Sequence, residues 1–151
     1  MKIEEEIEDI ISKDIRNLGY ILWGIELSGK NNSKLIRVYI DNEGAPINLR
    51  DCEIVSAQIK EVLENTELIN FNFVLEVSSP GIERTFFNIK QLKNFIEQTI
   101  LVKFEEDSRK DSVLGKLLSV SDNYIEVMNN KKESIKIDVN SYITSKLIYK
   151  G

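Results

Sequence analysis

The stretch Leu75-Glu76-Val77-Ser78-Ser79-Pro80-Gly81-Ile82-Glu83-Arg84, called the junction decapeptide below, lies near the midpoint of a chain of 151 residues. Its Pro80-Gly81 pair predicts a turn, because proline presets φ near about −65° and glycine accepts the positive φ of a type II turn. Before the decapeptide the pattern mixes helices with strands, whereas after it nearly every segment is typical of a strand. We therefore expect two domains, residues 1–84 and 85–151.

Charge is divided unevenly between the two halves. Residues 1–84 hold nine Lys and Arg against sixteen Asp and Glu, a net charge of −7, whereas residues 85–151 hold eleven against nine, a net charge of +2. The whole chain is acidic, and affinity for nucleic acid comes from cations that neutralise phosphates. A role facing RNA would therefore need a local basic patch or an intermediary protein.

The composition excludes several kinds of site. The chain has no histidine, which removes the commonest general base and the usual zinc ligand, and its single cysteine, Cys52, has no partner for an internal disulfide. Cys52 lies on the apolar face of a predicted helix, so we interpret it as a small buried hydrophobe rather than a reactive thiol. Neither a glycine-rich phosphate loop nor a calcium or magnesium loop occurs. We expect no metal, no cofactor, no small-molecule substrate and no enzymatic activity.

The chain also lacks the features of a membrane or exported protein. No apolar run approaches the roughly 20 residues that cross a bilayer. The sequence begins Met1-Lys2-Ile3-Glu4-Glu5-Glu6, which turns acidic at once and does not resemble a signal peptide. We therefore expect no membrane association and a cytoplasmic location.

Helical and strand periodicities alternate in the first half. Residues 3–18 carry an apolar stripe at helical spacing that Asp14 interrupts, and Asn48 with Asp51 three positions later predicts the start of a second amphipathic helix. The predicted strands are residues 20–27, 35–41 and 71–77. Polar residues 28–33 predict the loop of a hairpin between the first two strands. The order α-β-β-α-β predicts a two-layer α+β domain with both helices on one face of a small sheet.

The second half predicts strands almost throughout. One short helix is expected over residues 89–96. The predicted strands are residues 99–105, 113–120, 124–129, 133–138 and 144–149. Short strands joined by tight polar turns favour a small closed barrel, because closure removes exposed strand edges. Gly115 lies inside a predicted strand, where glycine commonly marks a bulge or sharp bend.

The segment Glu76–Arg84 closely resembles the signature of the bacterial ribosome maturation factor RimP family, written E-V-S-S-P-G-[LI]-[DE]-R-P-L. Further features that resemble the family are Tyr20, Arg37–Asp41, Asn48–Glu53 and Gly115–Val120. The likeness therefore spans nearly the whole chain. It departs from the signature after the arginine, where Thr85 replaces the usual proline and Phe86 replaces the usual leucine.

The resemblance implies an N-terminal α/β domain followed by a C-terminal SH3-like or Sm-like barrel. It implies a non-catalytic factor that binds the free small (30S) ribosomal subunit and assists its late assembly. In that family the barrel contacts a small-subunit ribosomal protein near the decoding region. The implied partners are therefore a basic ribosomal protein and, as a further alternative, 16S rRNA.

The junction decapeptide has two interpretations that its sequence leaves open. Ser-Pro-Gly is sufficient chemistry for a turn, so the segment can be purely structural. It also carries more polar groups than a turn requires: the hydroxyls of Ser78 and Ser79, the accessible backbone of Gly81, and Arg84, whose guanidinium can donate two bonds to a phosphate or carboxylate. Arg84 separates the interpretations, because it either meets the ribosome or pairs internally with Glu76 or Glu83.

Cations beside the predicted turns of the second half form a second candidate surface. These residues are Arg109, Lys110, Lys116, Lys131 and Lys132. The simplest interpretation of each alone is a solvated loop charge, and the functional interpretation is a contact with phosphates or with an acidic surface. With the junction residues they complete the predicted partner-binding set.

Three functions are compatible with these sequence features. In the favoured one, the barrel docks on a basic ribosomal protein of the immature subunit, and the acidic half screens or orients this contact. The main alternative is a general RNA-binding module built on an Sm-like barrel. An enzyme with Ser78 or Ser79 as nucleophile is the third, and the absence of histidine and of an identifiable base argues against it.

Overall fold

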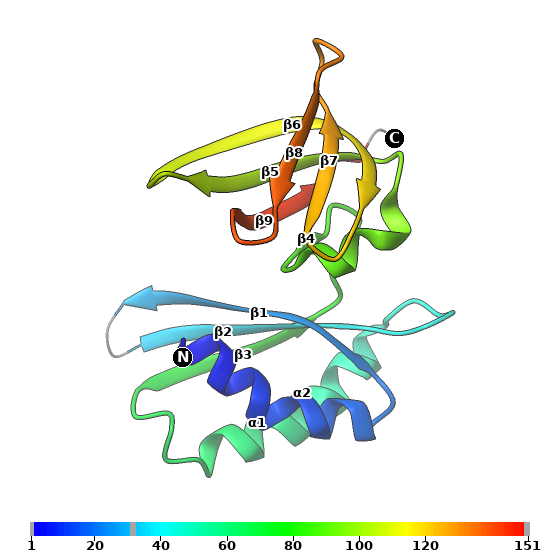
Figure 1. Cartoon of the computed structure of the whole chain (residues 1–151). Coiled ribbons are helices and arrows are strands. Elements are labelled where there is room, and N and C mark those ends of the chain that lie inside the picture. The colour runs from blue at the N-terminus through cyan, green and yellow to red at the C-terminus, as the bar shows by residue number, and fades with distance from the viewer. Residues whose placement is uncertain (1, 31–32, 150–151) are drawn as a thin grey trace. The chain divides into compact units, whose positions relative to one another are not determined.

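The computed structural model describes residues 2–30 and 33–149 of the chain (Figure 1). The chain divides into two compact units, Met1–Pro80 and Gly81–Gly151, called the N-terminal and C-terminal units below. The division falls inside the junction decapeptide, four residues before the boundary expected from the sequence. The chain combines two α-helices, both in the N-terminal unit, with β-strands in both units, so the predicted α+β class is confirmed.

The N-terminal unit follows the predicted order α-β-β-α-β. Its elements are α1 (Ile3–Asn17), β1 (Ile21–Lys30), β2 (Ser33–Asp41), α2 (Leu49–Glu64) and β3 (Asn72–Ser78). β1 and β2 are antiparallel, and β3 lies parallel to β2, giving the sheet order β1-β2-β3. Both helices cover the same face of this sheet (Figure 1), which leaves the opposite face, called the helix-free face, without a helical layer.

The core of the N-terminal unit lies between the helices and the sheet. Three isoleucines of α1, four residues apart, are fully buried, as their helical spacing predicts. They meet Ile36, Val38 and Ile40, the alternate residues of β2 that face the helices. Cys52 packs against this core and is half-buried, which agrees with its interpretation as a small hydrophobe.

Asn48 begins α2 through a reciprocal capping box. Its side-chain oxygen accepts from the Asp51 N–H at 2.9 Å, and the Asp51 carboxylate accepts from the Asn48 N–H at 2.8 Å. The Tyr20 hydroxyl donates to the same carboxylate at 2.5 Å. The start of α2 is thereby joined to the segment that follows α1, a link that the sequence did not predict.

Two details of the predicted N-terminal unit change. The strands of the first hairpin are longer than expected: β1 continues to Lys30 and β2 begins at Ser33, so three residues of the predicted loop at its start and one at its end belong to strands. The other two residues of that predicted loop, 31–32, lie outside the described part of the chain. Asp14, which interrupts the apolar stripe of α1, accepts a hydrogen bond from the Gln58 amide of α2 at 3.1 Å. Its place on the packed side is therefore explained by a contact between helices.

The C-terminal unit is formed almost entirely of strands. Its elements are β4 (Thr85–Phe86), the 3₁₀ helix η1 (Ile89–Phe95), β5 (Thr99–Glu106), β6 (Arg109–Val120), β7 (Tyr124–Met128), β8 (Ser134–Asp138) and β9 (Tyr142–Leu147). Five of the strands and the short helix were predicted, whereas β4 lies in a segment expected to be a linker. β6 begins at Arg109, so the turn before it is shorter than expected.

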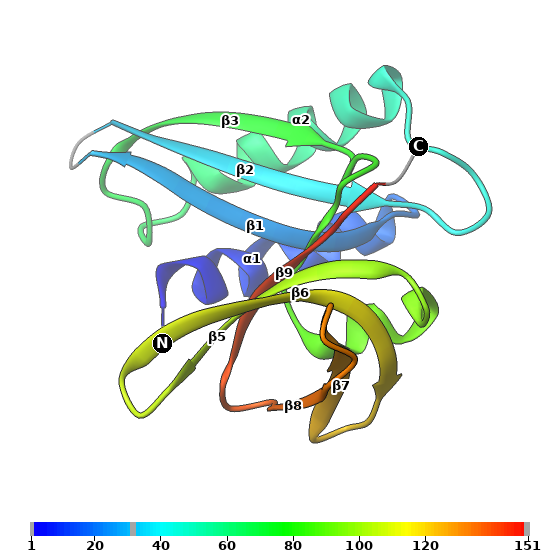
Figure 2. The same cartoon turned by 90° about the horizontal axis from the view of Figure 1, so that it is seen from above.

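The six strands form one antiparallel sheet in the order β4-β9-β5-β6-β7-β8. β6 bends strongly within this sheet (Figure 2). At Gly115 an added Cβ would lie 2.1 Å from the carbonyl oxygen of Met128, and the β6–β7 register shifts between Leu117 and Ser119. The predicted bend at Gly115 therefore has a cause, because no larger residue fits. Within the described residues no pairing joins the edges β4 and β8, so a closed barrel stays a prediction.

The interior of the C-terminal unit is apolar apart from one hydroxyl cluster. Phe86, Ile100, Val102 and Ile125 are fully buried. The Tyr142 hydroxyl donates to the Phe86 carbonyl at 2.8 Å and lies 2.7 Å from the hydroxyl of buried Ser145. These contacts link β4 to β9. In the described part of the chain no helix has the length and apolar character needed to span a bilayer.

Candidate functional site

The junction decapeptide has the positive φ that its sequence predicts at Gly81, but its turn lies at Ile82–Glu83, two residues after the predicted Pro80-Gly81 turn. β3 ends at Ser78, whose hydroxyl donates to the Ser79 carbonyl at 2.8 Å. Pro80 is buried, and Gly81 has a φ of +82° with no atom within 4 Å of the position a Cβ would take. Glycine is required at position 81 for its backbone conformation rather than for space. The turn chemistry thus accounts for Ser78, Pro80 and Gly81, and a partner contact at Ser78, Ser79 and Gly81 stays a prediction.

Arg84 lies in the C-terminal unit and is half-buried. Its guanidinium carbon lies 5.4 Å from the centre of the Phe95 ring in η1, a cation–π contact, and its carbonyl accepts from the Leu147 N–H at 2.9 Å. The two acids proposed as internal partners have other contacts: Glu76 forms an ion pair with Arg37, and the Glu83 carboxylate accepts from the Tyr149 N–H. Arg84 therefore has a structural role, and its contact with a partner stays a prediction.

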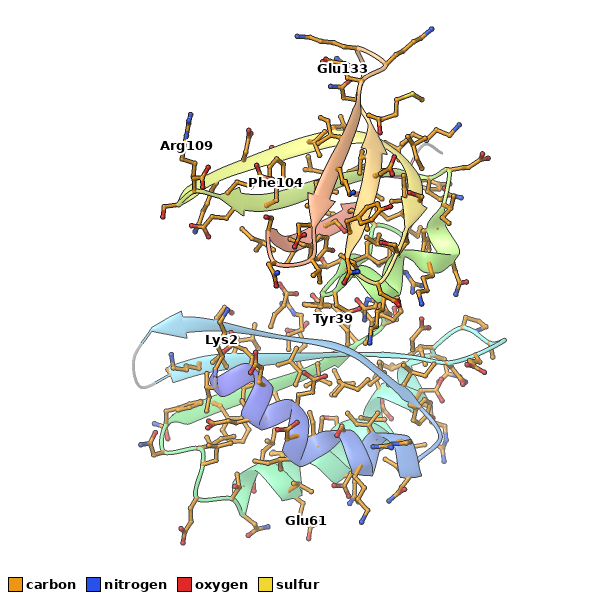
Figure 3. The ribbon with its side chains drawn as sticks, in the orientation of Figure 1. Lys2, Tyr39, Glu61, Phe104, Arg109 and Glu133 are labelled. Atoms are coloured by element: carbon orange, nitrogen blue, oxygen red, sulfur yellow. The ribbon has the colours of Figure 1, made fainter. Side chains whose placement is uncertain are left out.

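Arg109 and Lys110 lie at the tip of the β5–β6 hairpin (Figure 3), after a tight turn in which Asp107 and Ser108 both have positive φ. Both cations are exposed, but strand register places Glu106 opposite Arg109 and Glu105 opposite Lys110. Consecutive strand residues point to opposite faces, so the predicted pair does not form one patch.

Lys131 and Lys132 lie in the β7–β8 turn, and both are exposed. The Asn129 side-chain oxygen accepts from the N–H groups of Lys131 and Glu133, at 2.9 and 3.0 Å, which orders the turn. Glu133 follows directly at the end of this turn (Figure 3). The structure therefore separates these two lysines from the cations of the β5–β6 hairpin.

Strand register gathers four lysines on one face of the C-terminal sheet, a surface called the lysine face below. On β5, Lys103 lies opposite Ser112 of β6 and Thr144 of β9. The next row pairs Leu101 with Leu114 and Lys146, and the row after that pairs Thr99 with Lys116. Lys110, opposite Glu105, completes the set. The lysine face is Lys103, Lys110, Lys116 and Lys146.

All four ammonium-bearing side chains of the lysine face are exposed. The residues between them in the sequence turn the other way: Ile100, Val102, Val113 and Leu117 are buried on the inner side of the sheet. Among the described residues, no carboxylate lies within 4.0 Å of any of these four ammonium groups. One carboxylate, Glu105, shares the three-strand face with the lysines, so this face carries a net charge of about +3.

A shallow hollow of about 850 Å³ adjoins the lysine face. Its lining includes Thr99, Ser112, Leu114 and Lys116 from that face and Asn129 and Asn130 from the start of the β7–β8 turn. Leu114 is 55% exposed and provides an apolar surface between the lysines. The sequence identified two of the four lysines, Lys110 and Lys116. It did not include Lys103 and Lys146. In both strands exposed residues alternate with buried ones, and this alternation in the sequence was the signal that could have placed these two lysines on the outer face.

The helix-free face of the N-terminal sheet carries a second polar cluster that the sequence did not identify as a site. Arg37 lies 3.2 Å from the Glu76 carboxylate on the next strand, and the Tyr39 hydroxyl donates to Glu26. Burial and the hydrogen bond to Glu26 raise the pKa of Tyr39, so it stays protonated at neutral pH. Figure 3 shows Tyr39 on the side of the sheet away from the helices. Charges on this face are thus paired within the unit.

The described residues provide no metal-binding constellation. No group of three His, Cys, Asp or Glu side chains in the described ranges could hold a metal ion. Burial raises the pKa of the Cys52 thiol, which lowers its reactivity. The Ser78 hydroxyl donates to a backbone carbonyl, and the chain has no histidine that could act as its base.

Comparison with protein-family models matches residues 10–83 to the RimP N-terminal domain. The matched range runs from α1 through β3 and ends within the junction decapeptide, so it includes the capping box and the helix-free face. The motifs that resemble the family at Arg37–Asp41, Asn48–Glu53 and Glu76–Glu83 all lie inside it. The chain therefore belongs to the RimP family of ribosome maturation factors.

Proposed function

We propose that this protein binds the free small (30S) ribosomal subunit and assists its late assembly, without catalysing a covalent reaction and without a cofactor. The observation that carries this proposal is the match of residues 10–83 to the RimP N-terminal domain. One further observation supports it: the two units carry net charge of opposite sign. Its place of action is the cytoplasm, where free small subunits are assembled.

The C-terminal unit, in this proposal, is an SH3-like or Sm-like barrel. Consecutive strands β5, β6, β7 and β8 are neighbours, and β9 returns to the free side of β5. Gly115 and the register shift after Leu117 bend β6, and such a bend is needed to close a small sheet. The predicted contact residues lie in or before this unit: Ser78, Ser79, Gly81, Arg84, Arg109, Lys110, Lys116, Lys131 and Lys132.

The charge of the two units supports a division of the partners. The acidic N-terminal half attracts a basic ribosomal protein and repels RNA, and such complementarity raises the rate and specificity of association. Exposed acids on the two helices, Glu5, Glu53 and Glu61 among them, are available for this attraction; Figure 3 shows Glu61 on the side of α2 away from the sheet. The protein binds the correctly assembled small subunit preferentially. Binding therefore lowers the free energy of that arrangement relative to incompletely assembled arrangements.

A general RNA-binding module remains the second candidate function, and the lysine face favours it. Such a module would bind unrelated RNA as tightly as it binds the small subunit. The net charge of −5 works against unrestricted binding to phosphates, so we place this function second.

Co-sedimentation of the full chain with purified ribosomal particles tests the proposal. We expect the chain to sediment with free small subunits and to remain unbound with large subunits and with assembled ribosomes. Binding should weaken as the salt concentration rises, because the attraction is electrostatic. Failure to sediment with free small subunits would contradict the proposed function, and equal binding to unrelated RNA of the same length would favour the general RNA-binding module.

A further inference from the structure

We propose that the lysine face is a binding site for the phosphate backbone of RNA, with Lys103, Lys116 and Lys146 as its principal contacts. This inference rests on the proposed function, since ribosomal RNA is the RNA that a bound small subunit presents. It assigns the RNA contact to three strands of the C-terminal unit rather than to turn cations such as Lys131 and Lys132.

The spacing of the lysines fits an extended anion. Lys103 lies diagonally across from Lys146 and from Lys110, and diagonal neighbours on a sheet are about 7–8 Å apart. Lys110 and Lys116 lie six residues apart on β6, about 20 Å along an extended strand. Such an array can contact several phosphates in succession, whereas a single carboxylate or a small anion would meet one or two of the lysines.

The other residues of the face also suit RNA. Hydroxyl side chains lie directly opposite lysines: Ser112 and Thr144 share the row of Lys103, and Thr99 shares the row of Lys116. Such groups commonly donate to phosphate and sugar oxygens. Leu101 and Leu114 provide an apolar surface in the middle row, against which a sugar or base can lie. Arginine and aromatic side chains, the usual readers of bases, are absent from the three described rows. The site should therefore bind RNA without sequence preference.

The acidic residues nearby limit where the RNA can lie. Glu97 and Asp111 line the hollow beside the face together with Lys116, so the lining of the hollow has a net charge of −1 and RNA is expected on the face rather than in the hollow. Glu105 lies opposite Lys110 at the hairpin end and reduces the attraction there. The strongest positive potential is consequently expected around Lys103, Lys116 and Lys146.

The test compares two variants of the full chain that lose the same charge. The face variant carries Lys103→Gln, Lys116→Gln and Lys146→Gln, and the control variant carries Lys13→Gln, Lys90→Gln and Lys93→Gln. The control lysines are exposed and lie on α1 and η1, outside every surface described above. The probe is a fluorescein-labelled single-stranded RNA of about 20 nucleotides and mixed sequence, and its affinity is measured by anisotropy at several salt concentrations.

Three lost phosphate contacts should lower RNA affinity on the order of 100-fold at about 0.1 M salt, because log affinity falls with log salt by about 0.7 for each contact to a single strand. The salt slope of the face variant should accordingly be shallower by about 2. The control variant should change both quantities much less. Equal effects of the two variants would overturn the site, because net charge alone would then explain binding.

Two further arms keep the result interpretable. A Lys103→Arg, Lys116→Arg, Lys146→Arg variant should retain RNA affinity, since charge is preserved; a loss equal to that of the glutamine variant would contradict a phosphate contact. A polyglutamate peptide of similar length serves as the acidic-protein probe. Tighter binding of that peptide than of RNA to the lysine face would overturn the assignment to RNA.

The proposed function and this inference fail in different experiments. If the unmodified chain does not sediment with free small subunits, the proposed function fails whatever the RNA result. If it does sediment, and the face variant binds both RNA and subunits as well as the control variant does, the lysine face is wrong while the proposed function stands. Circular dichroism of each variant checks that the sheet is intact, and single substitutions of Lys103 and Lys146 replace the triple variant if it does not fold.

Discussion

On the helix-free face of the N-terminal sheet, charged side chains have partners within the same sheet. Arg37 lies 3.2 Å from Glu76, and the Tyr39 hydroxyl donates to Glu26. On the lysine face of the C-terminal sheet, four ammonium groups share three strands with one carboxylate, Glu105. Both surfaces are polar and outward-facing, but the first satisfies its charges internally and the second leaves a net positive charge.

The difference lies in strand register rather than in the number of charged residues. In the N-terminal sheet, Glu26, Arg37 and Glu76 fall on one row, so opposite charges are direct neighbours. In the C-terminal sheet, the residues opposite Lys103 are Ser112 and Thr144, and the residue opposite Lys116 on β5 is Thr99. Like charges that remain diagonal neighbours repel one another, and this cost is offset when an anion binds. A net positive charge retained on this face is what the proposed contact with RNA phosphates requires.

The largest expected effect is the loss of stability when a core residue of one unit is truncated. Because the two units have separate cores, we expect each unit to be destabilised independently of the other. Ile59 of α2 is fully buried in the N-terminal core, and Ile59→Ala should lower that unit's free energy of unfolding by about 2–5 kcal/mol. Trp23 in β1 is the single tryptophan of the chain, so its fluorescence follows the N-terminal unit. Hydrogen exchange of amides in β5 and β6 should remain unchanged.

The reciprocal variant provides the control. Ile125→Ala removes a fully buried side chain from β7, so it should accelerate exchange in the C-terminal unit and leave the Trp23 transition in place. If either substitution destabilises both units equally, the chain unfolds as one cooperative body, and the comparison of two separate units must be abandoned.

Substitutions at Gly115 and Gly81 distinguish two reasons for glycine: lack of space for a side chain, and a backbone conformation that other residues rarely adopt. At Gly115 an added Cβ would lie 2.1 Å from the Met128 carbonyl oxygen, so Gly115→Ala forces β6 away from β7 and should cost about 1–3 kcal/mol. At Gly81 the Cβ would meet nothing within 4 Å, and the cost of Gly81→Ala should be about 1 kcal/mol, arising from its φ of +82°. Urea unfolding followed by hydrogen exchange measures both.

The two glycine variants also bear on binding. Because Gly115 sets the bend of β6 beside Leu114 and Lys116, its substitution should weaken RNA binding as well as stability, whereas Gly81→Ala should leave RNA affinity unchanged. A Gly115→Ala protein as stable as the unmodified chain would show that β6 can shift without cost, and the bend would then have another cause.

Local patterns were sufficient to predict most of the fold. The stripe of α1, the cap at Asn48 and the strand alternation of residues 35–41 each depend on neighbours in sequence, and each was found where expected. β4 was missed because it has only two residues, too few for a periodicity, and is held by β9 from the other end of the unit. Asp14 looked anomalous because its partner, Gln58, belongs to another helix.

The candidate site was predicted less well because it depends on register. Sequence could indicate cations in or beside turns, Lys110 and Lys116 among them, and the structure places both in β6 as exposed residues. It could not place Lys103 beside Lys146, since these residues lie on β5 and β9 and become neighbours through the pairing of Leu101 with Lys146. It also could not show that Arg84 stacks on Phe95.

The smallest expected effect is the pH dependence of the N-terminal unit through Asp51. The Asn48 N–H and the Tyr20 hydroxyl hold the pKa of Asp51 below its usual range. A carboxylate with a lowered pKa in the folded state contributes stability above its unfolded pKa of about 4, and this contribution is lost as the pH falls through the folded value. Asp51→Asn should therefore make the stability of this unit less sensitive to acid between about pH 5 and pH 2.

The pH dependence of the unit's free energy of unfolding does not by itself test the role of Asp51, because protonation of Glu8 changes that free energy in the opposite direction. Burial and the neighbouring Asp9 and Glu5 raise the pKa of Glu8, so its protonation stabilises the folded state as the pH falls. The measurement is the difference between Asp51→Asn and the unmodified chain, from urea unfolding followed by Trp23 fluorescence at each pH. Tyr20→Phe, which removes one of the two donors, should reproduce part of the change. If the difference in free energy of unfolding between Asp51→Asn and the unmodified chain were the same at every pH in this range, the hydrogen bonds to Asp51 would add no net stability to its charged form.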